Sequence, residues 1–464
     1  MKISEILKIT GGRLISGDAS KDIDLASIST DSRTIKRGAF FLPLKGENFD
    51  GEKFVGGALA KGAIGSFVVS NSSFVIRRTS HETRTTNDVK VIIQVKDTTK
   101  ALQAIAHAHR MKFDIPVIGI TGSNGKTTVK DMIYEVLCPR FNVLKNEGTK
   151  NNHLGVPQTL LKLNGKHKIC VLEMGMNHKG EIRLLAGIAR PDIAVITNIG
   201  PSHLKFLRDL EGVFEAKKEI TEFLEKGSLL IVNGDDKYLS GLKSKRFKIE
   251  RFGFDDKNSL RASLVTAGLG CIEFLLDDKD LFRLNILGTH NVYNALAAIA
   301  VARHFKLSVN SIRRGLAGYS PSHMRLNIKK MAGITVIDDA YNSNPLSMQC
   351  ALQAMRIIPA AAKWIVSADM LELGEKENDF HKMIGESVAK SGFKGLLTFG
   401  RLSRHTYNRA VECGMAKESV WHCSSREEVA DILRKVAKKG DAVLVKGSRA
   451  MKMEEVVEKL KGRR

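Results

Sequence analysis

The chain has 464 residues, of which 43% are hydrophobic and 27% charged, and only 9 are prolines. This composition excludes disordered and collagen-like proteins, and the length predicts roughly two to four domains. No apolar stretch approaches the roughly 18 residues that a membrane span needs, and the amino-terminal sequence lacks the long apolar segment of an export signal. We therefore expect a soluble, cytoplasmic protein without a transmembrane segment.

The formal net charge is +23, from 73 basic and 50 acidic residues. Such an excess favours anionic partners, including nucleotides, phosphorylated metabolites, nucleic acid and acidic membrane surfaces, without choosing among them. The densest basic run, residues 243–251, is short and interrupted, which is more typical of a solvated face than of a nucleic-acid site. Six cysteines are spread singly, so we expect reduced thiols rather than a disulfide framework or a zinc site.

Residues 1–96 contain short β-like runs, such as 38–46 and 66–70, separated by glycines and polar turns. This pattern predicts a small α/β domain. The polar stretch 79–88 is expected to form a surface loop. A helical pattern over residues 98–111 then leads into a new unit, which places the first domain boundary near Asp97.

Beyond this boundary, nearly continuous apolar runs alternate with helix-like segments. Strands of this kind are buried on both faces, which predicts mostly parallel sheets covered by helices. The runs are residues 116–121, 169–173, 193–197 and 229–232, followed after Pro321 by 334–338, 364–367, 395–399 and 442–446. We expect an α/β protein of three domains: a small module over 1–96, a central P-loop ATPase domain over 97–321 and a Rossmann-like domain over 322–464.

A phosphate-binding loop follows the first central run, and its residues are Gly122, Ser123, Asn124, Gly125, Lys126, Thr127 and Thr128. A strand, a glycine turn and a helix start place backbone N–H groups and the positive helix end around a phosphate. Lys126 suits the β- and γ-phosphates, and the Thr127 hydroxyl suits Mg²⁺. Ile120 replaces the first glycine of the usual pattern, so the loop is a variant form. The pattern predicts ATP binding but names no reaction.

Polar residues at the ends of the next strands are candidates for the chemistry, because ligands bind at the carboxyl ends of parallel strands. Glu173 is a candidate Mg²⁺ ligand or a helix cap, and His203 is a candidate ligand or an ordinary polar residue. Lys217, by its sequence alone, is an ordinary lysine on a helix surface. Asn291 and Asn294 are three residues apart on a helix, from which their amides could read adenine or ribose.

Together these motifs resemble the Mur ligase family, ATP-dependent enzymes that form amide bonds in peptidoglycan precursors. The resemblance extends over nearly the whole chain. It rests on residues 29–33, 50–51, 122–127, 151–157, 173–175, His203, 216–220, 290–291, 338–344, 369–374 and 446–449. The last three of these runs resemble the branch that adds D-Ala-D-Ala to UDP-N-acetylmuramoyl-tripeptide.

The resemblance implies a role for each matching segment. The UDP part of the substrate would be held by Ser29, Thr30, Asp31, Ser32 and Arg33, and the remaining substrate groups by Asn151, Asn152, Tyr341, Asn342, Asn344, Lys446, Ser448 and Arg449. His290, Asn291, Asn294, Arg325 and Asp339 would join the loop in binding ATP. Two Mg²⁺ ions would be held by Thr127, Glu173, His203 and Lys217, with Lys217 carbamylated by CO₂. Lys126, Glu173, His203 and Lys217 would be the catalytic residues.

Two positions depart from the family's pattern. Lys218 stands where glycine is frequent, and His323 precedes Met-Arg where glycine is common, so the hinge before the last domain is expected to differ. Two alternatives stay open on the sequence: another amino-acid-adding member of the family, and a basic P-loop switch or nucleic-acid-associated ATPase that makes no amide bond. We expect a monomer without a nucleic-acid partner.

Overall fold

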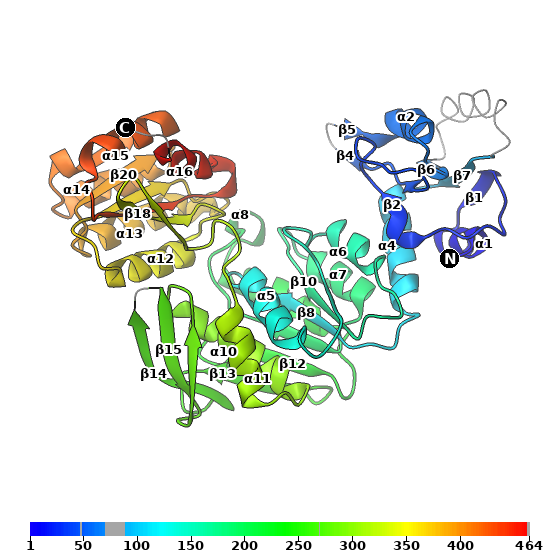
Figure 1. The fold of residues 1–464 in the computed structure, drawn as a ribbon, viewed down its shortest axis with the longest axis horizontal. Coiled ribbons are helices and arrows are strands. Elements are labelled where there is room, and N and C mark those ends of the chain that lie inside the picture. Colours follow the sequence, from blue (N-terminus) through cyan, green and yellow to red (C-terminus); the bar gives the residue numbers. More distant parts are fainter. Residues whose placement is uncertain (47–48, 70–88, 269, 462–464) are drawn as a thin grey trace. The chain divides into compact units, whose positions relative to one another are not determined.

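The computed structural model describes residues 1–46, 49–69, 89–268 and 270–461 (Figure 1). The expected surface loop at 79–88 lies outside the described residues. The chain divides into two compact units, one of residues 1–119, 141–174 and 183–191 and the other of residues 120–140, 175–182 and 192–464. The predicted domain boundaries at residues 96 and 321 are not boundaries of these units and stay predictions.

The first unit begins with a five-stranded sheet. Its order is β1 (Arg13–Ser16), β7 (Val91–Val95), β6 (Gly65–Val69), β3 (Phe40–Phe41) and β2 (Ile28–Ser29), with β1 antiparallel to β7 and the other neighbours parallel. Helix α1 (Ile3–Thr10) precedes the sheet, and α2 (Val55–Ala60) packs on its core. The run 38–46 contains two short strands, β3 and β4 (Lys45–Gly46). Strand β4 pairs with β5 (Phe49–Asp50). Pro43 lies between β3 and β4, and proline has no N–H to donate to a ladder.

The rest of the first unit includes the strand that ends at Glu173. Helix α4 (Thr98–Arg110) is capped by Asp97, whose carboxylate accepts from the Lys100 N–H at 2.9 Å, and confirms the helix predicted over 98–111. Strand β10 (Ile169–Glu173) runs parallel to β9 (Val143–Lys145) and is buried throughout. Helix α6 (Gly155–Leu160) lies between them in sequence, and α7 (Glu181–Ala189) follows β10.

The central sheet has nine strands and confirms the predicted parallel arrangement. Its order is β16 (Asp280–Leu284), β15 (Cys271–Leu276), β14 (Leu260–Gly268), β13 (Lys248–Gly253), β12 (Leu229–Asn233), β11 (Ile193–Ile196), β8 (Val117–Thr121), β10 and β9. Every residue of β8, β10, β11 and β12 is buried, as their apolar sequences predict. The boundary between the two units falls within β8.

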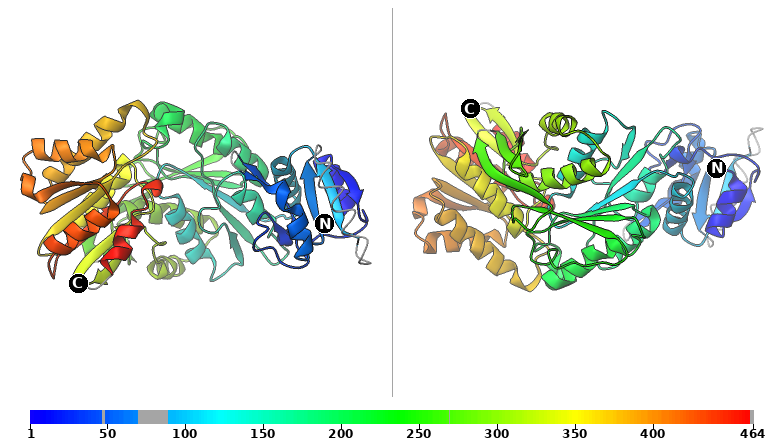
Figure 2. Two further views of the ribbon diagram at one scale, coloured as in Figure 1. Left: turned by 90° about the horizontal axis from the view of Figure 1, so that it is seen from above. Right: turned by 90° about the horizontal axis from the view of Figure 1, so that it is seen from below.

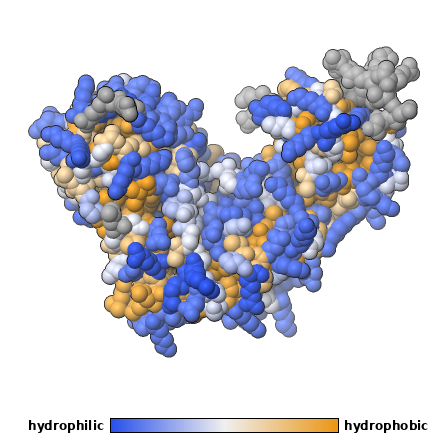
Figure 3. Space-filling view, in the orientation of Figure 1, coloured by the Kyte–Doolittle hydropathy of each residue, from blue (hydrophilic) through white to orange (hydrophobic). Residues whose placement is uncertain are grey.

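An antiparallel extension of this sheet, β14 to β16, was not predicted from the sequence. Its residues alternate between buried and more exposed positions, which gives a weaker signal than a continuous apolar run. The turn between β15 and β16 contains Asp277 and Asp278 at φ of 50° and 58°, a left-handed conformation that aspartate tolerates. Figure 3 shows hydrophobic residues at the surface in the region of β14 and β15, and Leu264 of β14 is 74% exposed.

Helices of the second unit follow strands of the central sheet in sequence. They are α5 (Lys126–Leu137), α8 (Leu204–Leu207), α9 (Leu210–Lys218), α10 (His290–His304) and α11 (Val309–Gly318). Helices α10 and α11 pack directly against strands of this sheet. Helix α10 is buried on nearly all sides and packs against α5, which explains why its sequence is apolar without a polar stripe. Helix α5 begins three residues before the predicted start at Val129, directly at Lys126.

The carboxy-terminal sheet confirms the predicted doubly wound domain. Its order is β17 (Asn327–Met331), β18 (Ile334–Asp339), β22 (Ala442–Lys446), β19 (Lys363–Ala368), β20 (Gly395–Phe399) and β21 (Val420–Cys423), all parallel except β17. Helices lie on both faces (Figure 2): α12 (Pro345–Ile357), α13 (Glu377–Ala389) and α14 (Ser403–Glu412) on one, α15 (Arg426–Val436) and α16 (Glu454–Leu460) on the other. Alternate strand residues fill two separate cores, as a two-sided sheet requires.

Register places the candidate residues of this sheet together. Asp339 at the end of β18 is paired with Lys446 at the end of β22, and Ser367 of β19 lies opposite Lys446 on the other side. The segments after these three strands therefore meet at one edge of the sheet. Over the described part of the chain, no helix has the length and apolar character needed to cross a lipid bilayer.

Candidate active site

The phosphate loop joins β8 to α5 and depends on two glycines. Gly122 has φ of +148° and Gly125, at the helix N-cap, has φ of +83°, conformations that favour glycine. A Cβ atom at Gly122 would overlap Oγ1 of Thr197, and one at Gly125 would overlap Oδ1 of Asn294. Space as well as backbone geometry therefore excludes side chains at both positions.

Residues after β11 fix the loop through hydrogen bonds. The Ser123 N–H donates to the Asn198 carbonyl at 3.0 Å, and the Asn124 N–H donates to Oδ1 of Asn198 at 3.0 Å. The Thr197 hydroxyl donates to the Asn124 carbonyl at 2.5 Å, and the Ser123 hydroxyl donates to the Gly200 carbonyl at 2.9 Å. The loop is thus fixed by the protein itself, and the first turn of α5 presents its N–H groups beyond it.

Lys126 and Thr127 begin α5 next to this loop. The Lys126 ammonium lies over the loop and donates to the carbonyls of Gly122 at 2.8 Å and Ser123 at 3.4 Å. The Thr127 hydroxyl accepts from the Arg325 guanidinium at 3.1 Å. A cation and a hydroxyl therefore stand at the positive end of a helix, an arrangement suited to phosphate.

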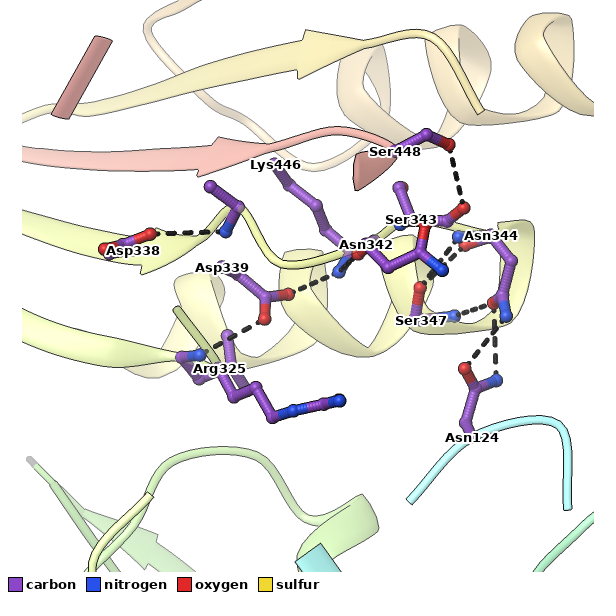
Figure 4. Close-up of polar contacts among 12 residues, drawn as sticks. Asn124, Arg325, Asp338, Asp339, Asn342, Ser343, Asn344, Ser347, Lys446 and Ser448 are labelled. Atoms are coloured by element: carbon purple, nitrogen blue, oxygen red, sulfur yellow. Dashed lines mark hydrogen bonds and ion pairs between the residues drawn. The ribbon is translucent and has the colours of Figure 1, made fainter. Parts of the chain in front are cut away.

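The carboxy-terminal sheet contributes residues to the same place, and both belong to the second unit. The side-chain amides of Asn344 and Asn124 bond to each other reciprocally, at 2.9 and 3.3 Å (Figure 4). Asn344 also caps α12 by accepting from the Ser347 N–H at 2.8 Å. The Arg325 guanidinium carbon lies 4.1 Å from the centre of the Tyr341 ring. The structure therefore brings Asn124, Thr127, Arg325, Tyr341 and Asn344 together, although they are about 200 residues apart.

A buried ion pair organises the segment after β18. The Lys446 ammonium donates to Asp339 at 2.6 Å and to the Asn342 carbonyl at 2.8 Å (Figure 4). Lys446 is 2% exposed, and burial raises the pKa of the Asp339 carboxyl, an effect that Lys446 opposes. Because its charge is already matched, Lys446 is placed to hold the 339–342 segment rather than to meet a ligand directly.

Ser448 and Arg449 follow β22 and differ in their surroundings. The Ser448 hydroxyl accepts from the Leu371 N–H at 2.9 Å and donates to the Ser343 carbonyl at 3.4 Å. Arg449 is paired with Glu454 at 2.9 Å, and 54% of its side chain is exposed. Arg449 therefore remains accessible to an anionic ligand, whereas Ser448 joins the ends of three strands.

His203 and Lys217 lie in the central part of the second unit. His203 caps α8 at φ of 55°, and its Nδ1 lies 2.7 Å from Oε2 of Glu372. Burial, then the Lys126 charge, lowers the pKa of His203, while Glu372 acts in the opposite direction. Lys217 is only 2% exposed, so its interpretation as a surface lysine is wrong. Its burial, then Lys126, lowers the Lys217 pKa well below the usual value, and the ammonium has no hydrogen-bond or ion-pair partner among the described residues.

His290, Asn291 and Asn294 lie at the start of α10. The Asn294 amide donates to Oδ1 of Asn291 at 2.8 Å, and the Asn291 amide donates to the Leu287 carbonyl at 2.6 Å. Both side chains are buried, and burial followed by the Lys446 charge lowers the pKa of His290 to about 4. In this arrangement Asn294 supports Gly125 from behind, and recognition of adenine or ribose by these amides stays a prediction.

The first unit holds the other predicted residues. Glu173 is 3% exposed, and its Oε1 accepts from the Asn151 amide at 2.7 Å. Oδ1 of Asn152 accepts from the N–H of Gly155, the first residue of α6, at 2.9 Å. Gln158 of α6 donates to the Thr30 hydroxyl at 3.0 Å, which brings the predicted UDP-binding segment against this helix.

The exposed end of that segment is an ion pair. Arg33 contacts Asp31 at 2.8 Å and holds the pKa of the Asp31 carboxyl at about 2. Ser32 offers its carbonyl to the Lys61 ammonium at 3.0 Å, and the Ser29 hydroxyl donates to the Asp31 carbonyl at 3.2 Å. The segment 29–33 thus presents a guanidinium at the surface, as an anionic ligand would require.

Sequence reasoning missed several residues of the site. Glu372 follows β19, and the sequence assigned no role to it. Thr197 and Asn198 follow β11, and Gln158 lies on the helix next to Asn152. The position after a buried parallel strand is the signal that could have selected the first three.

A metal site built from protein ligands alone is not present in the described part of the chain, where no group of three or more His, Cys, Asp or Glu side chains is arranged to hold an ion. Mg²⁺ does not require such a group, because it is usually held by one or two protein ligands, substrate phosphates and water. The Thr127 hydroxyl beside Lys126 and the Nε2 atom of His203, which has no hydrogen-bond partner among the described residues, fit that mode of binding.

Comparison with known families gives three matches that cover most of the chain. Residues 24–110 match the description "Mur ligase family, catalytic domain", residues 120–302 match "Mur ligase middle domain" and residues 324–449 match "Mur ligase, glutamate ligase domain". The matches include strands of the five-, nine- and six-stranded sheets.

Similar proteins match the chain over nearly their full length. The chain is 37% identical to UDP-N-acetylmuramoyl-tripeptide–D-alanyl-D-alanine ligase of Bacillus subtilis, over 99% of this chain and 98% of that protein. It is 32% identical to the Escherichia coli ligase of the same name, over 99% and 98%. Among solved structures, MurF from Acinetobacter baumannii matches with a TM-score of 0.87 and 29% identity, over 100% and 99% of the two chains. MurF ligase from Thermotoga maritima in complex with ADP matches with a TM-score of 0.82 and 26% identity, over 95% and 98%.

Proposed function

The chain belongs to the Mur ligase family, and from that premise we propose how its residues perform the family's reaction. The protein is an ATP-dependent ligase that joins D-Ala-D-Ala to UDP-N-acetylmuramoyl-tripeptide in peptidoglycan precursor synthesis. The observation that carries the assignment of roles is the meeting of the phosphate loop with strand ends of the carboxy-terminal sheet, through Asn344 on Asn124 and Arg325 on Thr127.

The phosphate loop and its neighbours bind ATP. Lys126 exchanges the loop carbonyls that it now contacts for the β- and γ-phosphates, and the N–H groups at the start of α5 surround them. Arg325 is within reach of the same phosphates, because its guanidinium already contacts Thr127. Asp339 and Lys446 act indirectly, since their buried pair holds the backbone from which Tyr341 and Asn342 project.

We assign two Mg²⁺ ions to the site. The Thr127 hydroxyl suits the first, and Glu173, His203 and a modified Lys217 are the residues for the second, an assignment that rests on their places in the sequence. When bound, the ions supply neutralisation of phosphate charge. The protein itself orients two of these side chains before the substrates bind: Glu372 contacts His203, and Asn151 donates to Glu173.

We propose that Lys217 is carbamylated, and its surroundings support this modification. Burial without an anionic partner favours the neutral amine, which is the form that attacks CO₂. The new N–C bond yields a carbamate with the release of one proton, so the side chain changes from a neutral amine to an anion. An anion is favoured beside Lys126, whereas the original ammonium is disfavoured there.

The substrate is divided among three domains in this proposal. The module of residues 1–96 holds the UDP part through residues 29–33, where Arg33 presents a guanidinium. The central domain, residues 97–321, contributes Asn151, which contacts Glu173, and Asn152. The domain of residues 322–464 contributes Tyr341, Asn342, Asn344, Ser448 and the exposed Arg449, which suits a peptide carboxylate.

The reaction follows from bringing these groups together. A carboxylate oxygen of the tripeptide attacks the γ-phosphorus of ATP, and the bond to ADP breaks, which gives an acyl phosphate. The amine of D-Ala-D-Ala then attacks the acyl carbon, inorganic phosphate leaves and the nitrogen loses a proton. Lys126 and Arg325 offset the charge that gathers during phosphoryl transfer, where positioning and electrostatics dominate.

An omission assay tests the assignment. The protein is incubated with ATP, Mg²⁺ and UDP-N-acetylmuramoyl-tripeptide, with D-Ala-D-Ala present, absent or replaced by a single amino acid. Phosphate release and product are expected only with the dipeptide, and release equal to the no-dipeptide control would reject the assignment. Parallel reactions with tripeptides that differ in their third residue identify the acceptor.

A further inference from the structure

The contact between His203 and Glu372 joins two parts of the second unit that are 169 residues apart. His203 follows the central strand β11, whereas Glu372 follows β19 of the carboxy-terminal sheet. The imidazole Nδ1 lies 2.7 Å from Oε2 of Glu372, and the side chains are 25% and 44% exposed. The two side chains are therefore partly exposed to solvent, and the distance between them is short enough for a hydrogen bond.

Both residues have unusual backbones. His203 has φ of 55° and Glu372 has φ of 64°, in the left-handed region that is unfavourable for non-glycine residues. Neither conformation is needed for a strand or a helix interior. Strain of this kind persists only where surrounding structure enforces it, and it is concentrated at functional sites.

The surrounding structure does enforce the position of Glu372. The Met370 N–H donates to Nε2 of His381 at 3.0 Å, and the Leu371 N–H donates to the Ser448 hydroxyl at 2.9 Å. The Glu372 carbonyl accepts from the Lys205 N–H at 3.1 Å. The segment that carries Glu372 is thus held at three successive backbone positions.

The segments also touch through their backbones. A Cβ atom at Gly374 would lie 3.3 Å from both the Leu204 carbonyl carbon and the Lys205 nitrogen. Ser202, which precedes His203, donates to the Ser123 hydroxyl of the phosphate loop at 3.0 Å. Glu372, His203 and the phosphate loop therefore form one continuous chain of contacts.

A carboxylate on one ring nitrogen decides what the other nitrogen can do. Glu372 accepts from Nδ1–H, which leaves the Nε2 lone pair for a cation. We propose that Glu372 is a positioning residue for His203: the carboxy-terminal domain supplies the carboxylate that fixes the histidine as an Nε2 donor to Mg²⁺ when it docks on the central domain. This inference deepens the proposed function and rests on it, because His203 is there assigned to the metal.

The test uses Glu372→Gln and Glu372→Ala in the full-length protein. Glu375→Gln is the matched control, because Glu375 lies three residues away, is exposed and has no hydrogen bond or ion pair among the described residues. Histidine-selective ¹⁵N labelling reports the tautomer of His203, with its signals identified by their loss in His203→Gln. We expect Nδ1–H in the wild type and in Glu375→Gln, and Nε2–H or a mixture in Glu372→Ala.

A second measurement links the tautomer to the metal. The Mg²⁺ concentration for half-maximal ligation should rise about 10- to 100-fold in both Glu372 variants, the range for residues that orient a metal ligand. The KM for D-Ala-D-Ala and the thermal unfolding midpoint should stay near wild type. In a His203→Gln background, Glu372→Gln should have no further effect on the Mg²⁺ requirement.

Two outcomes would overturn the inference. An unchanged His203 tautomer in Glu372→Ala would show that the carboxylate does not fix the ring, and an unchanged Mg²⁺ requirement in both variants would show that the ring position does not matter for metal binding. If the wild-type protein makes no amide bond, the proposed function fails instead, and the tautomer measurement still reports on the contact itself.

Discussion

Replacement of Gly125 by alanine is the perturbation whose cost follows most directly from the structure. At φ of +83° an alanine adds backbone strain of about 1–2 kcal/mol. Its Cβ would also overlap Oδ1 of the buried Asn294 and lie 3.2 Å from Cγ of the same residue. Displacing that amide breaks its bond to Asn291, which leaves a buried polar group unsatisfied at a cost of about 1–3 kcal/mol. We expect Gly125→Ala to lose about 2–5 kcal/mol in total, and to bind ADP more weakly.

Two comparisons separate the components. Gly227→Ala has a similar φ of +96° with nothing within 4 Å of the new Cβ, so it should show the backbone strain alone. In the double variant Gly125→Ala/Asn294→Ala the overlap is gone, because Asn294 has already been removed. The double variant should therefore be more stable than the sum of the single effects by about 1–3 kcal/mol.

Urea unfolding and ADP titration of the wild type, Gly125→Ala, Gly227→Ala, Asn294→Ala and the double variant measure these quantities. Equal losses in Gly125→Ala and Gly227→Ala, or strictly additive effects in the double variant, would refute the role assigned to Asn294 as the support of the phosphate loop.

Three further predictions concern the contacts around the loop. Asn344→Ser keeps a side chain that can cap α12 but removes the amide pair with Asn124, so ligation should slow while the unfolding free energy stays within about 0.5 kcal/mol of the wild type. Asn344→Ala should slow ligation and also lower the unfolding free energy by about 1 kcal/mol, because the cap is lost. Ligation rates equal to that of the wild type in both variants would contradict the assignment. Lys217→Ala should abolish most ligation, with partial recovery on adding short carboxylates, and unchanged turnover would remove Lys217 from the mechanism. The folded-state pKa of Lys217 lies well below 10.5, so between that lowered pKa and pH 10.5 the unfolded chain binds more protons than the folded chain. In CO₂-free buffer the free energy of unfolding should therefore rise with pH over this window. The rise should be smaller in Lys217→Met, which lacks the amine.

The sequence predicted the parallel strands well because each is a run of apolar residues buried on both faces. Strands β8, β11, β18 and β22 appear within one or two residues of their expected bounds. The antiparallel strands β14 to β16 were missed, because their partly exposed residues carry no continuous apolar run. The local sequence pattern therefore predicts the buried strands of the sheet but not the partly exposed strands at its edge.

The sequence predicted candidate residues that lie at or just after the end of a buried strand, such as Lys126 and Asp339. It did not predict residues that are buried by contacts with parts of the chain distant in sequence. Lys217 has the sequence surroundings of an exposed helical lysine, yet it is 2% exposed. The contacts of Arg325 with Thr127 and of Glu372 with His203 join residues more than 160 positions apart, and no local signal encodes such pairs. These contacts arise only from how the strand ends meet.

The fate of the tripeptide's carboxylate oxygens tests the central claim most directly. With both oxygens of the reacting carboxylate labelled with ¹⁸O, activation by phosphoryl transfer leaves one of them in the inorganic phosphate that is released. We predict ¹⁸O-labelled phosphate in step with formation of the dipeptide-extended product, and only when ATP, Mg²⁺ and D-Ala-D-Ala are all present. Unlabelled phosphate during product formation, or phosphate release that is independent of the dipeptide, would contradict the account.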